Sequence, residues 1–342
     1  MFTPLIEKLQ RRQDLTTEEA AAAMDRIMEG QAQPSQIAAL LVGLAMKGER
    51  PAEIVGFARV MRARAARLPR PVAPVFDTCG TGGDGAHTFN VSTVAALVLA
   101  GCGVKVAKHG NRSASSRCGS ADLLETLGVA IAAGPDVVLR CLEDVGIAFL
   151  FAQTFHPSMR HAAPTRRELG VRTAFNLLGP LTNPAGATRQ LVGVPRPELT
   201  ELVARSLALL GAERAWVVHG ADGLDELSTT GYTKVSECRD GAVNTFYVHP
   251  SDFGLPKGAP QALKGDDAAT NAAIARKILG GERGAARDIV LLNAGASLLI
   301  AGRVASIPEG IAAAAEAIDS GRATAVLDRL IALSNAGEVS AA

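Results

Sequence analysis

A glycine-dense loop between two apolar runs constrains the fold of this chain more than any other stretch. Four of its glycines fall within six positions: Gly80, Gly82, Gly83 and Gly85. Glycine costs conformational entropy on folding, so this density suggests a backbone that must turn tightly or admit a ligand. Apolar residues precede the loop at 72–76 and follow it at 94–99. A strand, a glycine loop and a helix in this order present backbone N–H groups to an anion, with phosphate as the first candidate.

Strands and helices alternate from residue 75 onwards, which predicts an α/β domain with a mainly parallel central sheet covered on both faces. The expected strands are 74–78, 104–107, 148–152, 190–194 and 215–219. The expected helices between them are 92–101, 120–127, 135–145 and 197–210. A hairpin with its turn at Asp240-Gly241 is expected over 233–249, and three or four helices over 267–335.

Residues 1–70 predict helices only. Thr16 and Glu19 have the spacing of a capping box, which starts a helix that ends near Gly30. We expect Ser35 to cap a second helix, in which apolar residues recur at helical spacing.

A third helix is expected from Pro51, because proline suits the first helical turn. Helices this short need a partner on which to pack. We therefore expect a small helical domain over 1–70, joined by about 170–188, and an α/β catalytic domain over 71–342.

Composition excludes several classes of protein. A chain of 342 residues with 48% hydrophobic and 20% charged residues can bury a large core. The net charge of +1 disfavours bulk attraction to nucleic acid or to a membrane, so we expect neither partner. Five cysteines without a CxxC pair, no signal-peptide pattern and no apolar run of membrane-spanning length predict a reduced, cytoplasmic protein.

The glycine loop has alternatives. Gly80, Gly82 and Gly85 match the dinucleotide fingerprint G-x-G-x-x-G, which also requires an acidic residue at the end of the next strand. That strand is instead followed by the basic run 108–112 (KHGNR), which disfavours a dinucleotide. The P-loop pattern is absent here. A glycine turn without a ligand stays open at this point.

A second polar loop, residues 108–122, follows the next strand. It holds three lysines or arginines, four serines and two glycines, a composition suited to several phosphate oxygens. A solvated surface loop would explain it alone. Both loops, however, leave the carboxyl ends of successive parallel strands, where open α/β sheets bind ligands. Together they predict an anionic ligand.

With both loops in view, the chain resembles the anthranilate phosphoribosyltransferase family. The matching stretches follow the family's order: 77–84, 90–93, 108–122, 156–160, 166–170, 179–184 and 225–226. The resemblance implies a nucleoside-phosphorylase-like fold, in which a small helical domain carries the homodimer contact. It also implies phosphoribosyl pyrophosphate (PRPP) and anthranilate as substrates, with Mg²⁺, two ions to each site. Ser158, Thr165 and Tyr232 depart from the family's usual residues.

The two loops are the expected PRPP site. Backbone amides of the first loop and the helix N-terminus suit the departing pyrophosphate, while Lys108 and the second loop suit phosphate and ribose oxygens. The residues so assigned are Gly80, Gly82, Gly83, Asp84, Thr88, Asn90, Val91, Ser92, Thr93, Lys108, His109, Gly110, Asn111, Arg112, Ser113, Ala114, Ser115, Ser116 and Ser120.

Asp225 and Glu226 are the expected metal carboxylates. Adjacent acidic residues on a loop are usually only solvated, but Mg²⁺ is commonly held by one or two carboxylates plus substrate phosphates. The family assigns Ser92, Asp225 and Glu226 to the two Mg²⁺ ions.

Arg166 matches the family's carboxylate-binding arginine, and a guanidinium fork fits the planar carboxylate of anthranilate. A surface arginine in a basic run is the alternative. Gly80, His109, Asn111 and His156 would line the approach. An aromatic amine is unprotonated at pH 7, so no general base is assigned; His156 is the candidate to position the amine or accept a proton.

The expected reaction is the Mg²⁺-dependent transfer of phosphoribose to the amine of anthranilate, with inversion at C1. A pyrimidine nucleoside phosphorylase is the first alternative, but it needs no acidic pair. A non-catalytic relative that binds nucleic acid is the second, and it would require a broad basic face.

Overall fold

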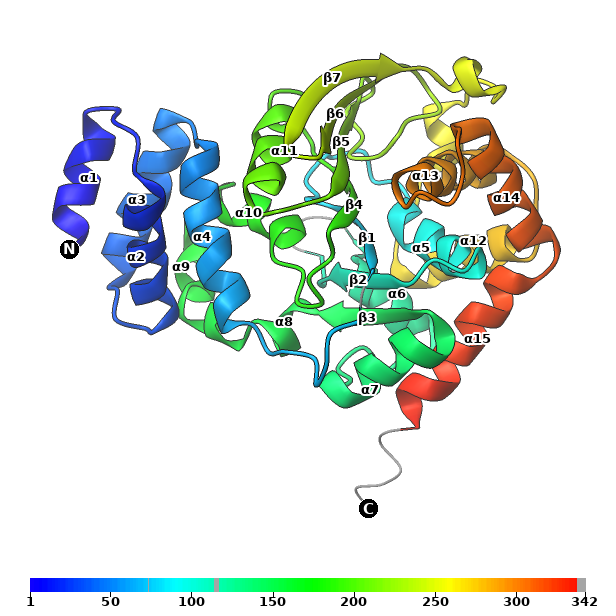
Figure 1. Ribbon diagram of the computed structural model, residues 1–342, viewed down its shortest axis with the longest axis horizontal. Helices are drawn as coiled ribbons and strands as arrows, with labels where there is room; N and C mark the ends of the chain where they lie inside the picture. The colour runs from blue at the N-terminus through cyan, green and yellow to red at the C-terminus, as the bar shows by residue number, and fades with distance from the viewer. Residues whose placement is uncertain (73, 114–116, 337–342) are drawn as a thin grey trace.

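The computed structural model describes residues 1–72, 74–113 and 117–336, and in this part of the chain a seven-stranded sheet forms the centre of the molecule (Figure 1). Its strands are β1 (Phe76–Gly80), β2 (Val106–Gly110), β3 (Ile147–Phe151), β4 (Arg189–Gly193), β5 (Arg214–Gly220), β6 (Thr233–Arg239) and β7 (Ala242–Val248). They lie in the order β3-β2-β1-β4-β5-β6-β7. β1 to β5 are parallel, and β6 and β7 add an antiparallel hairpin at one edge.

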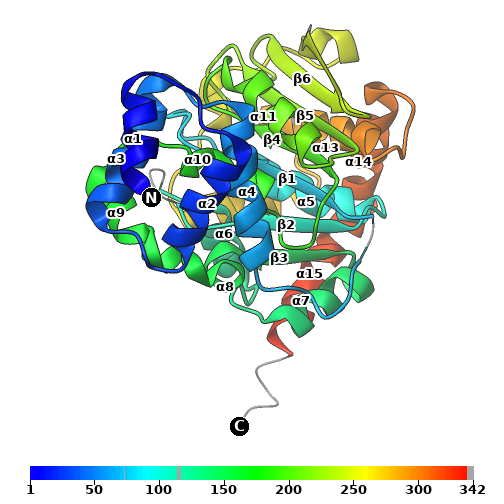
Figure 2. The same cartoon turned by 60° about the vertical axis from the view of Figure 1, so that its left-hand side comes forward.

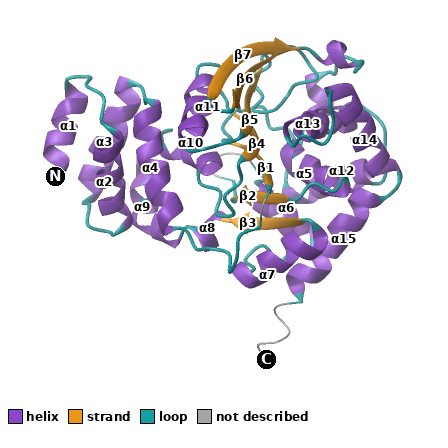
Figure 3. Cartoon of the chain, viewed as in Figure 1, coloured by secondary structure: helices purple, strands orange, loops and turns teal. Residues whose placement is uncertain are grey.

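Helices surround this sheet and form a separate group at the N-terminus (Figure 3). The N-terminal helices are α1 (Phe2–Gln10), α2 (Thr17–Met28), α3 (Pro34–Lys47) and α4 (Pro51–Arg64). The others are α5 (Val91–Gly101), α6 (Ser120–Leu127), α7 (Pro135–Arg140), α8 (Ala152–Phe155), α9 (Ala163–Leu169), α10 (Phe175–Leu178), α11 (Leu199–Leu209), α12 (Ala268–Leu279), α13 (Ala285–Ile300), α14 (Ile307–Asp319) and α15 (Arg322–Asn335). A π-helical turn, 141–145, continues α7.

The two faces of the sheet are covered by different helices. α5 is apolar on all sides and packs between the sheet and helices α13 and α15, on the right in Figure 1. Its residues 94–99 are completely or almost completely buried. α11 covers β5 and β6 from the other face, next to the helical group. The predicted class, a small helical domain with a large α/β domain and a mainly parallel sheet, is confirmed.

The N-terminal helices share a core with residues from the middle of the chain. α9 packs on α3 and α10 packs on α4, which Figure 2 shows from the helical side. Leu40, Phe57 and Phe175 are buried in the same cluster. Segments more than a hundred residues apart therefore build the helical region together.

The local predictions for this region are mostly confirmed. Thr16 and Glu19 form the expected capping box, with the Glu19 N–H donating to Thr16 Oγ1. The prediction that Ser35 caps the second helix is wrong. α3 begins at Pro34, because proline fits the first helical position, and Gln33 is the N-cap.

β1 and β2 lie two to three residues later in the chain than the expected strands 74–78 and 104–107. β1 runs to Gly80 and β2 to Gly110, so Asp77 and Lys108 lie inside strands and are buried. The hairpin turn is where it was predicted, and both turn residues, Asp240 and Gly241, have positive φ. Four helices, α12 to α15, occupy the predicted 267–335 region.

None of the described helices is both long enough and apolar enough to span a membrane.

Candidate active site

The site lies at the carboxyl ends of β1 and β4, where the chain connections leave in opposite directions along the sheet. Gly80 and Gly193 end these strands side by side. A Cβ atom on Gly193 would lie 1.5 Å from the Asp225 carbonyl oxygen, and one on Gly80 would lie 2.2 Å from Asp225 Oδ2. Glycine is therefore required at both positions, because any side chain there would prevent the loop after β5 from contacting the strand ends.

Asp225 connects this loop to the glycine loop. Its Oδ2 accepts a hydrogen bond of 2.8 Å from the Gly82 backbone N–H. Gly82, Gly83 and Gly85 all have a positive φ, between 66° and 79°. Residues with a side chain rarely adopt this backbone conformation. The glycine density of the sequence is therefore required by the loop's backbone.

Glu226 connects the same loop to the N-terminus of α5. Its Oε1 accepts a 3.0 Å hydrogen bond from the Ser92 backbone N–H, one of the donors that an α-helix leaves without an internal partner. Thr78 Oγ1 donates to the Ser92 carbonyl at 2.9 Å, which ties β1 to the same turn. The adjacent carboxylates thus each bind one backbone amide of a predicted phosphate-binding element.

A buried polar network lies beneath the site. Asp77 is fully buried and accepts hydrogen bonds from the His109 N–H at 3.2 Å and from Asn183 Nδ2 at 2.8 Å. Lys108 is 3% exposed, and its Nζ donates to the Thr78 carbonyl at 2.5 Å. Burial raises the pKa of Asp77 to about 6, and the Lys108 ammonium opposes this shift. The network fixes the ends of β1 and β2 relative to each other.

The acidic side chains of the site repel one another. Burial and the Asp84 carboxylate raise the pKa of Asp225 to about 7, and burial and Asp225 raise the pKa of Glu226 to about 8. A bound cation would relieve this repulsion and favour the ionised carboxylates. Among the described residues, no group of three or more His, Cys, Asp or Glu side chains is arranged to hold a metal. Two carboxylates that need further oxygen ligands fit Mg²⁺.

Two histidines lie next to each other under the loop 179–182. The rings of His109 and His156 are 5.1 Å apart. His109 Nδ1 lies 3.0 Å from the Gly179 carbonyl and His156 Nε2 lies 3.1 Å from the Thr182 carbonyl, so both of these nitrogens must donate. Burial lowers the pKa of His109 to about 3 and that of His156 to about 4, so both rings are neutral. His109 Nε2 is a buried acceptor without a partner among the described residues.

Arg166 projects from α9 and places its guanidinium carbon 4.9 Å from the centre of the Phe175 ring. Partial burial lowers its pKa. Within the described residues, no group accepts a hydrogen bond from this guanidinium and no carboxylate pairs with it. A desolvated cation on an aromatic face, with its donors available, is suited to bind an anionic group.

Comparisons with known proteins show the family of the chain. Residues 3–65 match the model of the helical bundle domain of a glycosyl transferase family, and residues 72–324 match its a/b domain. Anthranilate phosphoribosyltransferase of Moorella thermoacetica is 56% identical, over 97% of this chain and 98% of the relative. The chain belongs to the anthranilate phosphoribosyltransferase family.

Solved structures of this family have the same fold. The enzyme of Thermus thermophilus is 48% identical with a TM-score of 0.90, covering 96% of this chain and 99% of that one. The yeast enzyme in complex with PRPP and Mg is 29% identical with a TM-score of 0.90, covering 98% of both chains. A second structure of the yeast enzyme contains 4-fluoroanthranilate.

The second predicted loop is only partly described. Ala114, Ser115 and Ser116 lie outside the described residues. Arg112, one of the predicted PRPP residues, is paired in this structure with Asp122 and Glu125 at 2.8 and 2.7 Å. These carboxylates turn its guanidinium towards α6.

The remaining predicted residues line the two loops. Ser120 Oγ donates to the Asn111 carbonyl at 3.3 Å, and a Cβ on Gly110 would meet that hydroxyl at 2.3 Å. The Gly119 and Ser113 N–H groups both donate to Asp122.

The other predicted PRPP residues lie at or just before the start of α5. Asn90 is its N-cap and donates to the Cys118 carbonyl at 3.1 Å, which joins the two loops. Val91 and Thr93 are buried in the first turn, and Thr93 Oγ1 has no partner among the described residues. Thr88 forms a β-bridge with Lys264, a contact that no local sequence pattern predicts.

Sequence reasoning missed several residues of the site. Gly193 was a strand residue without a role, although glycine at the end of a parallel strand is a detectable signal. Asp77 and Asn183 lie in the family-matching stretches 77–84 and 179–184, but no individual role is predicted for either. No role is predicted for Arg172 from the sequence, yet its Nη1 donates to the Gly82 carbonyl at 2.8 Å. No spacing rule links residues 90 positions apart in the chain.

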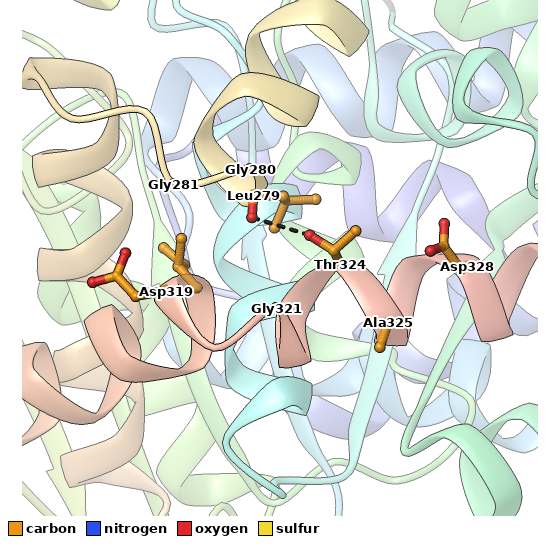
Figure 4. A pocket seen from close by; sticks show the side chains of 9 residues that line it. Leu279, Gly280, Gly281, Asp319, Gly321, Thr324, Ala325 and Asp328 are labelled. Carbon is orange, nitrogen blue, oxygen red and sulfur yellow. Dashed lines mark hydrogen bonds between the residues drawn. The ribbon is translucent and has the colours of Figure 1, made fainter.

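A hollow of about 510 Å³ lies away from the strand ends, between α12, α14 and α15 (Figure 4). Thr324 Oγ1 donates to the Leu279 carbonyl across it, at 3.0 Å. Asp319 at its rim is already paired with Arg287 at 2.7 Å. The hollow contains no residue of the predicted site.

Proposed function

We propose that this protein transfers phosphoribose from PRPP to the amine of anthranilate, giving N-(5-phosphoribosyl)anthranilate and pyrophosphate in tryptophan biosynthesis. One observation carries the proposal. The acidic loop 225–226 binds the glycine loop through Gly82 and the start of α5 through Ser92, at the switch point of the sheet. This arrangement combines amide donors for an anion with carboxylates for its counter-cation.

The groups of the site are suited to stabilise pyrophosphate as it leaves C1 of the ribose. Cleavage of the bond between C1 and oxygen places negative charge on pyrophosphate, and preorganised donors stabilise such charge most. The backbone amides of the glycine loop and the turn at Asn90–Thr93 are these donors. Lys108 contributes a buried positive charge, with its Nζ bound to the Thr78 carbonyl of β1. The PRPP residues assigned from the sequence remain our proposal for the rest of the ligand.

We propose two Mg²⁺ ions in each site, with Ser92, Asp225 and Glu226 as the protein ligands. When bound, Mg²⁺ neutralises charge on the pyrophosphate and orients it. The raised pKa values of Asp225 and Glu226 support this assignment, because the two side chains are held together at a cost that a cation offsets. The presence of Mg with PRPP in the yeast relative also supports it.

We place anthranilate against the two histidines and Arg166, whose polar groups match its carboxylate and its amine. The Arg166 guanidinium offers donors to a carboxylate, and the buried lone pair of His109 Nε2 offers an acceptor to the N–H groups of an aromatic amine. With its pKa lowered to about 4, His156 is a weak base. The amine attacks a cation-like C1 with its own lone pair, so the proposal includes no general base.

A homodimer through the helical region is part of the proposal. Met46 and Val171 belong to this region and are 75% and 59% exposed, and burial against a second copy would remove this apolar surface from water. Sedimentation at micromolar concentration tests it, and a monomer would contradict it. From composition we also propose a cytoplasmic location and no nucleic-acid partner.

One assay tests the reaction. Purified protein is mixed with PRPP, Mg²⁺ and anthranilate, and the loss of anthranilate fluorescence is followed. We expect turnover that requires all three. Phosphorolysis of a pyrimidine nucleoside without transfer to anthranilate would replace this function with the phosphorylase alternative.

A further inference from the structure

Both polar atoms of the Gly82 backbone unit are held by charged side chains from other parts of the chain. The Gly82 N–H donates to Asp225 Oδ2, and the Gly82 carbonyl accepts from Arg172 Nη1, each at 2.8 Å. Asp225 comes from the loop after β5, and Arg172 comes from the segment between α9 and α10. A loop built of glycines has little rigidity of its own, so these two contacts determine where its amides point.

The loop backbone is shaped around the Arg172 guanidinium. A Cβ on Gly83 would lie 1.7 Å from Arg172 Nη1 and 2.9 Å from Cζ. Gly83 has a φ of 79°, so it turns the chain immediately after the carbonyl that Arg172 binds. Any side chain at this position would occupy the space of the guanidinium.

The charges around Arg172 place it at the acidic side of the site. Burial and the Arg196 guanidinium lower the pKa of Arg172, and the Asp225 and Asp84 carboxylates oppose this shift. Arg196 lies 3.4 Å from Glu198, which partly balances its charge. Arg172 therefore supplies positive charge where a polyphosphate would otherwise meet carboxylates.

The segment that carries Arg172 belongs to the helical region. α9 packs on α3 and α10 packs on α4, so the position of Arg172 follows these helices. The glycine loop belongs to the α/β domain. The bond from Arg172 to Gly82 is thus a direct connection between the helical region and the pyrophosphate side of the site.

We propose that Arg172 is a positioning residue of the phosphoribosyl site, which holds the Gly82 carbonyl so that the loop amides face the pyrophosphate group. This inference rests on the proposed function. Because Arg172 acts through the glycine loop, its removal weakens binding of PRPP and of pyrophosphate and leaves binding of anthranilate intact.

The test compares Arg172→Met and Arg172→Lys with the wild type and with Arg205→Met. Arg205 is an exposed arginine of α11, 3.6 Å from Glu201, and has no contact with the site. Loss of a charge-assisted hydrogen bond predicts a KM for PRPP raised about tenfold or more in Arg172→Met, with the KM for anthranilate within about twofold. Arg172→Lys keeps a cationic donor and restores part of the loss. Arg205→Met leaves both KM values unchanged.

Several outcomes would overturn the proposal. An unchanged KM for PRPP, an equal rise in both KM values, or no difference between the methionine and lysine variants would each do so. Calorimetric titration with magnesium pyrophosphate gives a readout that does not depend on turnover, and equal binding by wild type and Arg172→Met would also refute it. If the wild type shows no transfer to anthranilate, the proposed function fails, whereas this titration still decides the role of Arg172.

Discussion

Substitution of Gly193 by alanine probes the architecture of the site most directly. The new Cβ would lie 1.5 Å from the Asp225 carbonyl oxygen, 2.3 Å from its carbonyl carbon and 3.0 Å from its Cα. Ordinary van der Waals contact begins at 3.4 Å, so the oxygen must recede by 3.4 − 1.5, or 1.9 Å. All three atoms are backbone, and a side-chain rotation therefore does not relieve the clash.

Two effects follow, one on the stability of the fold and one on the rate of the reaction. Insertion of a methyl group into a packed region lowers the free energy of unfolding by about 1–3 kcal/mol. A misplacement of about 1 Å in a catalytic group costs about 100-fold in rate, or about 2.7 kcal/mol of barrier. Since Asp225 must move farther than this, we expect kcat/KM for PRPP to fall at least about 100-fold in a protein that still folds.

Two matched alanine variants make the measurement decisive. A Cβ on Gly134 meets nothing within 4 Å, so Gly134→Ala is expected to have wild-type activity, and its stability falls only by the roughly 1 kcal/mol or less that alanine costs at the N-cap of α7. In Gly80→Ala the nearest atom is the Asp225 side-chain oxygen, which can move, so activity falls while the urea midpoint changes little. Initial rates from anthranilate fluorescence and urea denaturation provide both quantities. Wild-type kcat/KM in Gly193→Ala would refute the placement of Asp225 at the reacting end of the site.

Three further predictions concern charge. Asp225→Asn with Glu226→Gln should lower turnover at least about 100-fold and raise the Mg²⁺ concentration needed for half-maximal rate, and unchanged Mg²⁺ dependence would contradict the metal assignment. Arg166→Met should raise the KM for anthranilate about tenfold or more with the KM for PRPP nearly constant, and the reverse pattern would remove Arg166 from the anthranilate site. Because folding raises the pKa of Asp225 to about 7 and of Glu226 to about 8, protons compete with Mg²⁺ below these values. Apparent Mg²⁺ affinity, measured from activity against Mg²⁺ concentration, should therefore rise from pH 6 to 8 and then level off, and a flat profile would contradict the raised pKa values.

The sequence predicted the elements whose signals are local. α6 lies at the predicted 120–127, and the capping box at Thr16 and the turn at Asp240 are where expected, because each depends on a few neighbouring residues. The ends of β1 and β2 were placed two or three residues too early. Apolar runs indicate only the first half of these strands, since Asp77 and Lys108 are buried by a polar network that the sequence does not display.

The site was predicted in part for the same reason. The glycine loop and the pair 225–226 are recognisable from composition and from the family's motifs. Gly82 and Asp225, however, are 143 residues apart, and their hydrogen bond depends on the close approach that Gly193 permits. The contact of Arg172 depends on how the helical region packs on the sheet. Such contacts follow from tertiary structure, and no periodicity reports them.

The hydrogen bonds of the acidic pair explain why an aspartate-bearing loop can serve an anion. In this structure Asp225 and Glu226 accept from the Gly82 and Ser92 amides, which are donors that a pyrophosphate oxygen would need. Each amide has one hydrogen, so carboxylate and phosphate compete for it. We expect the carboxylates to leave these donors when a cation offers them a stronger partner, since burial and a neighbouring carboxylate raise the pKa of each and disfavour its charged form. The amides are then available to phosphate. Anion and cation binding are therefore coupled through Gly82 and Ser92, and neither half of the site is complete without the other.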